Sequence, residues 1–395
     1  MGKIVSLCKR RGFIFSGSEI YGGFAGFWDY GPLGVALKNN FKNLWWRKFV
    51  DSREDMYGLD AAIVMNPKVW ESSGHVSGFS DPLGDGERFN TMFKTSVGAG
   101  EDAATSYLRP ETAQGIFVNF KNIINSFHPK LPFGIAQIGK AFRNEIAPRD
   151  FIFRAREFEQ MEIEYFIKEE DWKNTFEYWR EEMKSWLESI GLDKNKLHEV
   201  EVPEEERAHY SKRTIDFEYD FPFGRKELCG LAYRTDFDLT NHKLKFFNEE
   251  SKEEFVPHCI EPTFGLDRLV LAVLSEAYTE DELGGEKRIF LKLKTEMSPI
   301  KVAVFPLLKN KPELVEKARG IYTDLKAKSY ELKAVFDDNG NIGKRYRRQD
   351  EIGTPHCVTI DFQTLEDDTV TVRDRDSGKQ DRVKVSELIG FIKSV

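Results

Sequence analysis

Apolar and charged residues alternate most regularly between Phe133 and Phe166, in the segment FGIAQIGKAFRNEIAPRDFIFRAREFEQMEIEYF. This alternation predicts two strands, Ile135–Glu145 and Arg154–Phe166, joined by a basic turn. Because successive side chains of a strand point to opposite faces, the second strand has an apolar face and a face that carries Arg154, Arg156, Phe158, Gln160, Glu162 and Glu164. Unpaired buried charge is costly, so this charged face either lies in solvent or surrounds a ligand.

Helical spacing of apolar residues predicts a long helix over Val35–Val50. The apolar side of this helix either joins the core or faces a second subunit. We expect short strands and loops over Asp60–Phe93, with a tight hairpin turn at Gly84-Asp85-Gly86. Other predicted helices cover Ile4–Phe15, the residues after Thr112, and Glu169–Gly191, and other predicted strands cover Thr214–Phe221, Arg225–Tyr233 and Phe255–Glu261.

A strand, a glycine turn and an apolar helix follow one another in the segment EPTFGLDRLVLAVLSEAY, which begins at Glu261. Arg268 falls in the first turn of this helix, where a positive charge opposes the helix dipole. Its position is explained by a bound phosphate or by an internal salt bridge, and both remain open. Glu111 precedes the helix after Thr112, where an acid either caps the helix or serves a site.

The composition changes at Ser298-Pro299, after which strands alternate with helices. This order predicts a compact α/β module with a mixed sheet, and it divides the chain into residues 1–298 and 299–395. The module contains a basic run around Tyr346. Such a run suits single-stranded nucleic acid, although it equally fits a solvated helix face. The run comprises Lys344, Arg345, Arg347 and Arg348.

The chain has 395 residues and a net charge of -8, which argues against non-specific coating of nucleic acid. Its four cysteines are scattered and form no C-x-x-C pair, so we expect a reducing compartment and no zinc site. No apolar run approaches the roughly 20 residues of a membrane span. These features predict a cytoplasmic protein with no membrane partner.

Several motifs resemble those of class II aminoacyl-tRNA synthetases, namely FRNE, FRAREFEQMEIEYF and EPTFGLDRL. Five more narrow the resemblance to the homodimeric glycyl-tRNA synthetases: LRPETAQGIF, GFWDYGPLG, RTDFDL, GKRYRRQDEIGTP and VTVRDRD. The resemblance spans nearly the whole chain. It implies an α+β catalytic domain with a central antiparallel sheet, a smaller α/β anticodon-binding domain with a mixed sheet, and a homodimer formed around Trp28–Val50.

The resemblance also implies a reaction, in which glycine is activated by ATP with Mg²⁺ and then transferred to the 3′ end of tRNA(Gly). Arg143, Glu145 and Arg268 correspond to the catalytic residues, and Glu227 to a neighbour of Mg²⁺. The implied ATP-binding residues are Arg143, Asn144, Glu145, Phe153, Arg154, Arg156, Phe158, Glu227, Leu228, Arg234, Gly265 and Arg268. The basic run from Lys344 to Arg348 would contact the anticodon arm.

The implied glycine-binding residues are Glu111, Arg143, Gln160, Glu162, Glu261 and Thr263, among which the three glutamates would bind the ammonium group. Thr263 stands where most relatives have serine. Its extra methyl group either tightens the pocket or displaces glycine slightly. Rejection of alanine must be steric, and overpacking by one methyl group costs about 1–3 kcal/mol.

Relatives carry a long insertion between the segments that resemble GHVSGFSDP and NTMFKT. In this chain Gly84-Asp85-Gly86 closes the gap. The chain is either a natural minimal form of the family or a trimmed version. Arg88 is not assumed to replace the arginine of the insertion that contacts substrate in relatives. Two alternatives to a glycine ligase are weighed: a catalytically silent synthetase-like subunit that only binds nucleic acid, and a class II synthetase for proline, threonine or histidine.

Overall fold

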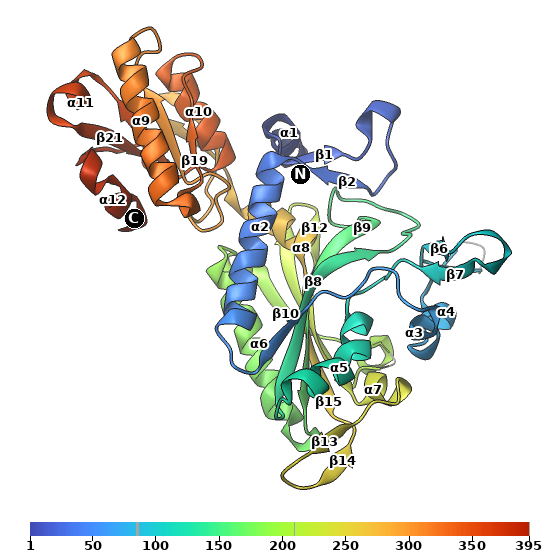
Figure 1. The fold of residues 1–395 in the computed structure, drawn as a ribbon. Coiled ribbons are helices and arrows are strands. Elements are labelled where there is room, and N and C mark those ends of the chain that lie inside the picture. Colours follow the sequence, from blue (N-terminus) through green and yellow to red (C-terminus); the bar gives the residue numbers. More distant parts are fainter. Residues whose placement is uncertain (84–86, 209, 395) are drawn as a thin grey trace. The chain divides into compact units, whose positions relative to one another are not determined.

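The structure is a computed structural model that describes residues 1–83, 87–208 and 210–394 (Figure 1). Contacts divide the chain into two compact units. The first, here called the terminal unit, comprises Met1–Phe15, Asp29–Phe41 and Val273–Val395; the second, the core unit, comprises Ser16–Trp28 and Lys42–Ala272. This division differs from the predicted boundary after residue 298, because residues 273–298 and two N-terminal segments also belong to the terminal unit. No helix among the described residues is both long and apolar enough to cross a membrane.

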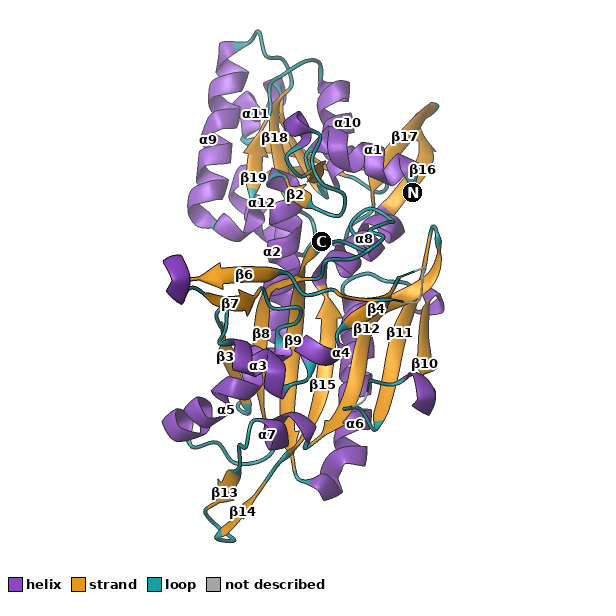
Figure 2. Cartoon of the chain, turned by 90° about the vertical axis from the view of Figure 1, so that its right-hand side faces the viewer, coloured by secondary structure: helices purple, strands orange, loops and turns teal. Residues whose placement is uncertain are grey.

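The core unit is built on a seven-stranded sheet with the order β10-β11-β12-β15-β9-β8-β3 (Figure 2). All neighbours pair antiparallel except β3 and β8, which are parallel. The predicted central antiparallel sheet is therefore confirmed. Its strands are β3 (Met56–Leu59), β8 (Phe133–Phe142), β9 (Glu157–Ile167), β10 (Leu197–Glu201), β11 (Arg213–Phe221), β12 (Gly224–Thr235) and β15 (His258–Gly265).

The predicted central hairpin exists, but its strands are shorter than expected. β8 ends at Phe142 and β9 begins at Glu157, with Gln137 opposite Glu162. Arg143, Glu145, Arg154 and Arg156 therefore lie in the connecting segment. The alternation predicted that Arg154 and Arg156 share a strand face with Glu162, and this prediction was wrong. The reason is physical: the backbone amides of Asn144 and Arg156 donate to the carbonyls of Thr91 and Gly26, so these residues bond to other segments instead of extending the ladder.

Helices cover both faces of this sheet. On one face Trp179 and Trp186 of α6 (Trp172–Ser189) and Trp45 of α2 (Pro32–Trp46) gather around Phe49 and Phe264. On the other face α5 (Ala113–Phe127) packs Phe117 and Phe120 against the aromatic end of the hairpin. The face that carries Glu162 and Glu164 is consequently buried, and the alternative of a solvated charged face is wrong.

The predicted helix over Val35–Val50 is present as α2, followed by a π-helical turn, Arg47–Asp51. Leu37, Phe41, Trp45 and Phe49 are fully buried, whereas Val35 is exposed. This apolar side therefore belongs to the core of its own chain, which leaves little of it for a second subunit.

The segment Asp60–Phe93 differs most from its prediction, because helices replace expected strands. Asn66 caps α3 (Pro67–Ser72) by accepting a bond from the Lys68 amide, and Pro67 occupies the first turn. α4 (His75–Gly78) follows, and then β4 (Ser80–Pro82) pairs with β5 (Arg88–Asn90). The turn predicted at Gly84-Asp85-Gly86 lies outside the described residues. Further elements of the core unit are β6 (Lys94–Val97), β7 (Ala104–Tyr107), α7 (Phe237–Asn241), β13 (Phe246–Asn248) and β14 (Glu253–Phe255).

The terminal unit contains a five-stranded mixed sheet with the order β19-β18-β20-β21-β22, which confirms the predicted α/β module. Sequence patterns did not predict α11 (Phe362–Asp367) or β22 (Gln380–Lys384). Other elements are α1 (Gly2–Arg11), β16 (Tyr278–Leu283), β17 (Glu286–Leu291), β18 (Val302–Pro306), α9 (Pro312–Lys328), β19 (Ala334–Phe336), α10 (Ile342–Ile352), β20 (His356–Ile360), β21 (Thr369–Asp374) and α12 (Leu388–Ser394). β1 (Ile14–Ser16), β2 (Trp28–Tyr30) and α8 (Leu266–Ala277) each lie at a boundary between the units.

Candidate active site

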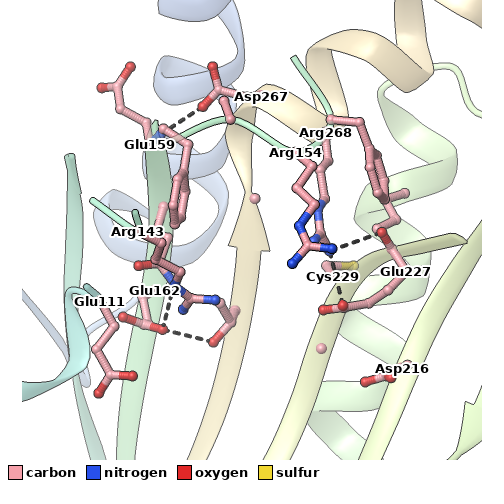
Figure 3. Close-up of a pocket in the computed structure, with 18 of the residues that line it drawn as sticks. Glu111, Arg143, Arg154, Glu159, Glu162, Asp216, Glu227, Cys229, Asp267 and Arg268 are labelled. Carbon is pink, nitrogen blue, oxygen red and sulfur yellow. Dashed lines mark hydrogen bonds and ion pairs between the residues drawn. The ribbon is translucent and has the colours of Figure 1, made fainter. Parts of the chain in front are cut away.

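A cavity of about 270 Å³ opens in the core unit, on the sheet face that carries Glu162 (Figure 3). Its walls come from β9, β11, β12, β15, the start of α8 and the segment between β8 and β9. The structure brings together most of the predicted site residues along this cavity: Glu111, Arg143, Glu145, Phe153, Arg154, Phe158, Gln160, Glu162, Glu227, Leu228, Glu261, Thr263, Gly265 and Arg268. Three of the predicted glycine- and ATP-binding residues do not line it: Asn144, Arg156 and Arg234.

One end of the cavity is formed by carboxylates on neighbouring strands. Thr263 of β15 lies opposite Glu162 of β9, and its hydroxyl oxygen is 3.0 Å from an oxygen of Glu162 and 3.0 Å from an oxygen of Glu261. The Thr112 hydroxyl donates to the other oxygen of Glu162. Burial, together with Glu261 and Glu111 nearby, raises the pKa of Glu162 to about 8.

Glu111 completes this acidic end, and its contacts rule against the helix-capping alternative. His75 Nε2 lies 3.3 Å from one Glu111 oxygen, and Gln114 donates to the other at 3.3 Å. Burial alone would raise the pKa of Glu111, but His75, Arg234 and Arg143 hold it well below its ordinary value. Glu111 is therefore an ionised carboxylate at the acidic end of the cavity.

Arg234 is the clearest correction among the predicted ligand contacts. Its side chain is 1% exposed, and its guanidinium donates to Asp238 at 2.8 and 2.9 Å and to Glu261 at 2.8 Å. The ring of Tyr210 lies 3.8 Å from the guanidinium carbon. Each of its three nitrogens thus donates within the protein, and one of these bonds fixes an oxygen of Glu261.

The other end of the cavity, here called the basic end, carries Arg154 and Arg268, each paired with a carboxylate. Arg268 forms an ion pair of 3.0 Å with Glu227, and its guanidinium lies 4.6 Å from the centre of the Phe153 ring. Arg268 lowers the pKa of Glu227. Of the two explanations kept open for Arg268, the structure shows the salt bridge, while 29% of the side chain remains exposed toward the cavity.

The segment between β8 and β9 contributes two more arginines to the cavity, Arg154 near Arg268 and Arg143 near Glu162 (Figure 3). Arg154 Nε donates to Glu145 at 2.6 Å, and Arg143 Nε donates to the Pro110 carbonyl at 3.0 Å. The guanidinium of Arg143 lies between two rings, 5.2 Å from Phe79 and 5.4 Å from Phe158. Both arginines therefore have a fixed position beside the cavity.

Asn144 and Arg156 hold the segment without lining the cavity. The Asn144 amide donates to the Thr91 carbonyl at 2.7 Å. Arg156 donates to the carbonyls of Glu145 and Ala25, each at 3.0 Å. Neither residue lines the cavity, and their predicted contacts with ATP stay predictions.

Several residues of the site were not identified from sequence. Asp216 lines the cavity, and burial together with Glu227 and Glu218 raises its pKa to about 7. The alternation in TIDFEYDF places Thr214 and Asp216 on one face and was a usable signal. The contact between His75 and Glu111 had no such signal, since the two residues belong to separate segments.

The basic run of α10 is only partly available to a ligand. Arg345 is 1% exposed and donates to the carbonyls of Pro306, Asp338 and Gly340. Tyr346 contacts the Thr359 hydroxyl at 2.6 Å, and Arg348 donates to Asp337 at 2.6 and 3.0 Å. Arg345 therefore stabilises the loop after β19 and is not a surface contact, which corrects the prediction, whereas Lys344 is exposed.

Comparison with known proteins agrees with this arrangement. The family model "tRNA synthetase class II core domain (G, H, P, S and T)" matches residues 93–277, and "Anticodon binding domain" matches residues 301–395. These two matches identify the class of the chain, a class II aminoacyl-tRNA synthetase.

Curated relatives define the family more narrowly. The glycine–tRNA ligase of Clostridium acetobutylicum is 48% identical over 99% of this chain and 98% of its own length. That of Caldanaerobacter subterraneus is 46% identical over 99% and 97%, and that of Thermus thermophilus 45% identical over 100% and 98%. The chain belongs to the glycine–tRNA ligase family of aminoacyl-tRNA ligases. This result confirms the predicted fold class, family and activity.

Proposed function

We propose that the acidic end of the cavity binds the ammonium group of glycine and that the basic end binds ATP. The observation that carries this proposal is the separation of charge within one cavity. Glu111, Glu162 and Glu261 lie on one side of the cavity and Arg154 and Arg268 on the other, while Arg143 lies close to Glu111. Glycine bound between them would direct its carboxylate toward the arginines.

The chemistry needs positioning and neutralisation of charge more than a general base. The carboxylate of glycine is already a nucleophile, so it attacks the α-phosphorus of ATP and pyrophosphate leaves. Arg143 is assigned to the α-phosphate and the glycine carboxylate, and Arg268 to the γ-phosphate. Glu145 and Phe158 are assigned to the adenine base, Glu145 after Arg154 has moved from it. The adenylate then transfers its glycyl group to the terminal ribose of tRNA.

ATP is used here with Mg²⁺, and Glu227 fits such an ion because carboxylate oxygens are its preferred protein ligands. Asp216 offers a second carboxylate on the same wall of the cavity. When bound, Mg²⁺ would neutralise phosphate charge. Arg268, paired with Glu227 in this structure, would contact phosphate beside it. We assign no role to zinc, since the four cysteines are separate buried thiols.

Selection of glycine is assigned to the wall that contains Thr263. Its hydroxyl is fixed by two carboxylates, so its methyl group cannot rotate away without breaking those contacts. Exclusion of one methyl group corresponds to about 10- to 200-fold discrimination between substrates.

We also propose that the chain works as a cytoplasmic homodimer with functional domains 1–298 and 299–395, of which the second binds the tRNA(Gly) anticodon. The match over residues 301–395 supports the domain boundary. Since the apolar side of α2 is buried, the exposed residues Ile20, Tyr21 and Phe24 are the better candidates for the dimer contact. Sedimentation equilibrium tests this: the wild type should be dimeric, and an I20S/F24S variant should shift toward monomer.

The shortened connection between β4 and β5 should affect the two half-reactions differently. Alignments with relatives extend over 457 and 497 positions, beyond the 395 residues of this chain, so relatives contain residues that it lacks. Every residue assigned to glycine and ATP lies elsewhere. Activation should therefore survive, while tRNA charging should be weak and sensitive to salt. Grafting a relative's insertion between Leu83 and Arg88 should improve charging alone; equal gains in both steps would contradict this division.

ATP–pyrophosphate exchange with a panel of amino acids tests the assignment of the cavity. Exchange should occur with glycine and be lost when Glu261 is replaced by Gln, while Glu181→Gln, a change of the same kind on the exposed side of α6, should have no effect. Undiminished exchange in the Glu261 variant would contradict the ammonium site.

A further inference from the structure

The hydroxyl group of Thr263 lies between two carboxyl groups but has only one proton. Its oxygen is 3.0 Å from Glu162 and 3.0 Å from Glu261, both hydrogen-bond distances. A hydroxyl donates once and accepts through its lone pairs. If both glutamates were ionised, one of these two contacts would be an oxygen–oxygen approach without a proton. The arrangement therefore requires one additional proton on one of the glutamates.

The surroundings of the two glutamates decide which of them holds this proton. Glu261 receives a charged donor, since Arg234 binds its second oxygen at 2.8 Å. Glu162 receives only neutral donors, the Thr112 hydroxyl and the Gln160 amide at 3.4 Å. The Glu162 residue is also 1% exposed. Burial without a charged donor therefore makes Glu162 the better candidate for the proton.

The charged groups around Glu162 are mixed in sign. Two acids face it from β15 and from the segment before α5, Glu261 and Glu111, and Glu164 follows it on β9. Arg234 of β12 neutralises Glu261, and Arg109 contributes positive charge at longer range. Three other titratable neighbours are His75, Tyr210 and Cys259. His75 pairs with Glu111, and Cys259 donates to Glu164. Burial and the neighbouring acids raise the pKa of Glu162 to about 8, in agreement with the proton count.

We propose that the empty pocket holds a proton on Glu162, which donates to Thr263 while Thr263 donates to Glu261, and that glycine binding displaces this proton to solvent. This inference rests on the proposed ammonium site. An ammonium group carries three donors and no acceptor, so it matches three carboxylates that each accept one bond. A protonated Glu162 is a poorer acceptor, and the positive ligand favours its ionised form. The products of the step are a carboxylate and one proton taken up by buffer.

Glu164 provides a matched control for this proposal. It is the next residue on the same face of β9, its side chain is fully buried, and one of its oxygens has no hydrogen-bond partner among the described residues. Unlike Glu162, it does not line the cavity. A Glu164→Gln variant therefore removes a neighbouring acid without removing the group proposed to release the proton.

Calorimetric titration of glycine into the full chain, in buffers of different ionisation enthalpy, counts the released protons directly. At pH 7 the wild type should release nearly one proton per site, and its dissociation constant for glycine should fall about tenfold from pH 6 to pH 7. Glu164→Gln should behave like the wild type. Glu162→Gln should bind glycine more weakly, release no proton and lose the pH dependence.

The outcomes separate this inference from the site on which it rests. Glycine binding without proton release in the wild type would overturn the inference and leave the ammonium site intact. Proton release that persists in the Glu162→Gln variant would also overturn it. If the wild type bound no glycine at any pH, with or without nucleotide, the ammonium site itself would be contradicted.

Discussion

Arginine side chains have opposite surroundings in the two units of this protein. In the core unit, Arg154 and Arg268 line a cavity with about a third of each side chain exposed. In the terminal unit, Arg288 and Arg345 are each 1–2% exposed, and they donate to acids or backbone carbonyls. The same guanidinium chemistry therefore serves ligand binding in one unit and internal structure in the other.

The difference teaches that a basic run in a sequence does not by itself mark a binding surface. Arg373 and Arg375 of the terminal unit are likewise used for internal contacts. Arg373 donates to Asp350 from both of its terminal nitrogens, and Arg375 donates to the carbonyls of Gly353 and Leu293. Within the core unit, Arg234 is an internal arginine as well. A guanidinium is therefore a candidate ligand contact where a cavity reaches it.

The largest effect should follow from removal of a cavity arginine. Arg143→Ala and Arg268→Ala should each lower the rate of ATP–pyrophosphate exchange by about 100- to 1000-fold, because one charged donor to the developing phosphate charge is lost. Circular dichroism should show an unchanged fold. Normal exchange in either variant would contradict the role assigned to that arginine.

Removal of a buried arginine should instead affect stability. Arg345→Ala leaves the carbonyls of Pro306, Asp338 and Gly340 without a donor, so the free energy of unfolding should fall by about 3 kcal/mol. Urea denaturation measures this change. The neighbouring surface variant Lys344→Ala should stay within about 0.5 kcal/mol of the wild type. Equal losses of stability in both variants would show that Arg345 has no special structural role.

A buried glutamate, Glu162, and an exposed one, Glu181, should differ in how they affect the dependence of stability on pH. The pKa of Glu162 rises from an ordinary 4.5 to about 8 in the folded protein. Between these values the folded state holds a proton that the unfolded state has lost, so stability should fall as pH rises, by up to about 1.4 kcal/mol per pH unit. Denaturation of Glu162→Gln across pH 5–8 should lack this contribution, while Glu181→Gln should retain the wild-type slope.

The smallest effect concerns the accessible part of the basic run. Arg347 is 37% exposed and pairs with Glu286, and Lys344 is exposed. Replacing both by Gln should raise the KM for tRNA a few-fold and flatten its salt dependence, with glycine and ATP parameters unchanged. An effect confined to glycine binding would show that these residues do not contact tRNA.

Sequence patterns predicted the elements whose side chains alternate or repeat over many residues. The hairpin of β8 and β9, helix α6 and the mixed sheet of the terminal unit were all predicted, because each has long-range periodicity. The helices α3 and α4 were missed, since they are too short for a periodic signal. Within the site, Glu162 and Glu261 could be proposed from motifs, whereas the pairing of Arg234 with Asp238 depends on tertiary contacts that no local pattern contains.

The most direct test of the two-ended cavity is a crystal structure of the chain bound to a non-hydrolysable glycyl-adenylate analogue, a glycyl sulfamoyl adenosine. The account predicts that the ammonium group lies about 3 Å from oxygens of Glu111, Glu162 and Glu261. It also predicts that the sulfamoyl group, which replaces the phosphate, lies beside Arg143. An analogue bound with its ammonium group away from these glutamates would contradict the account.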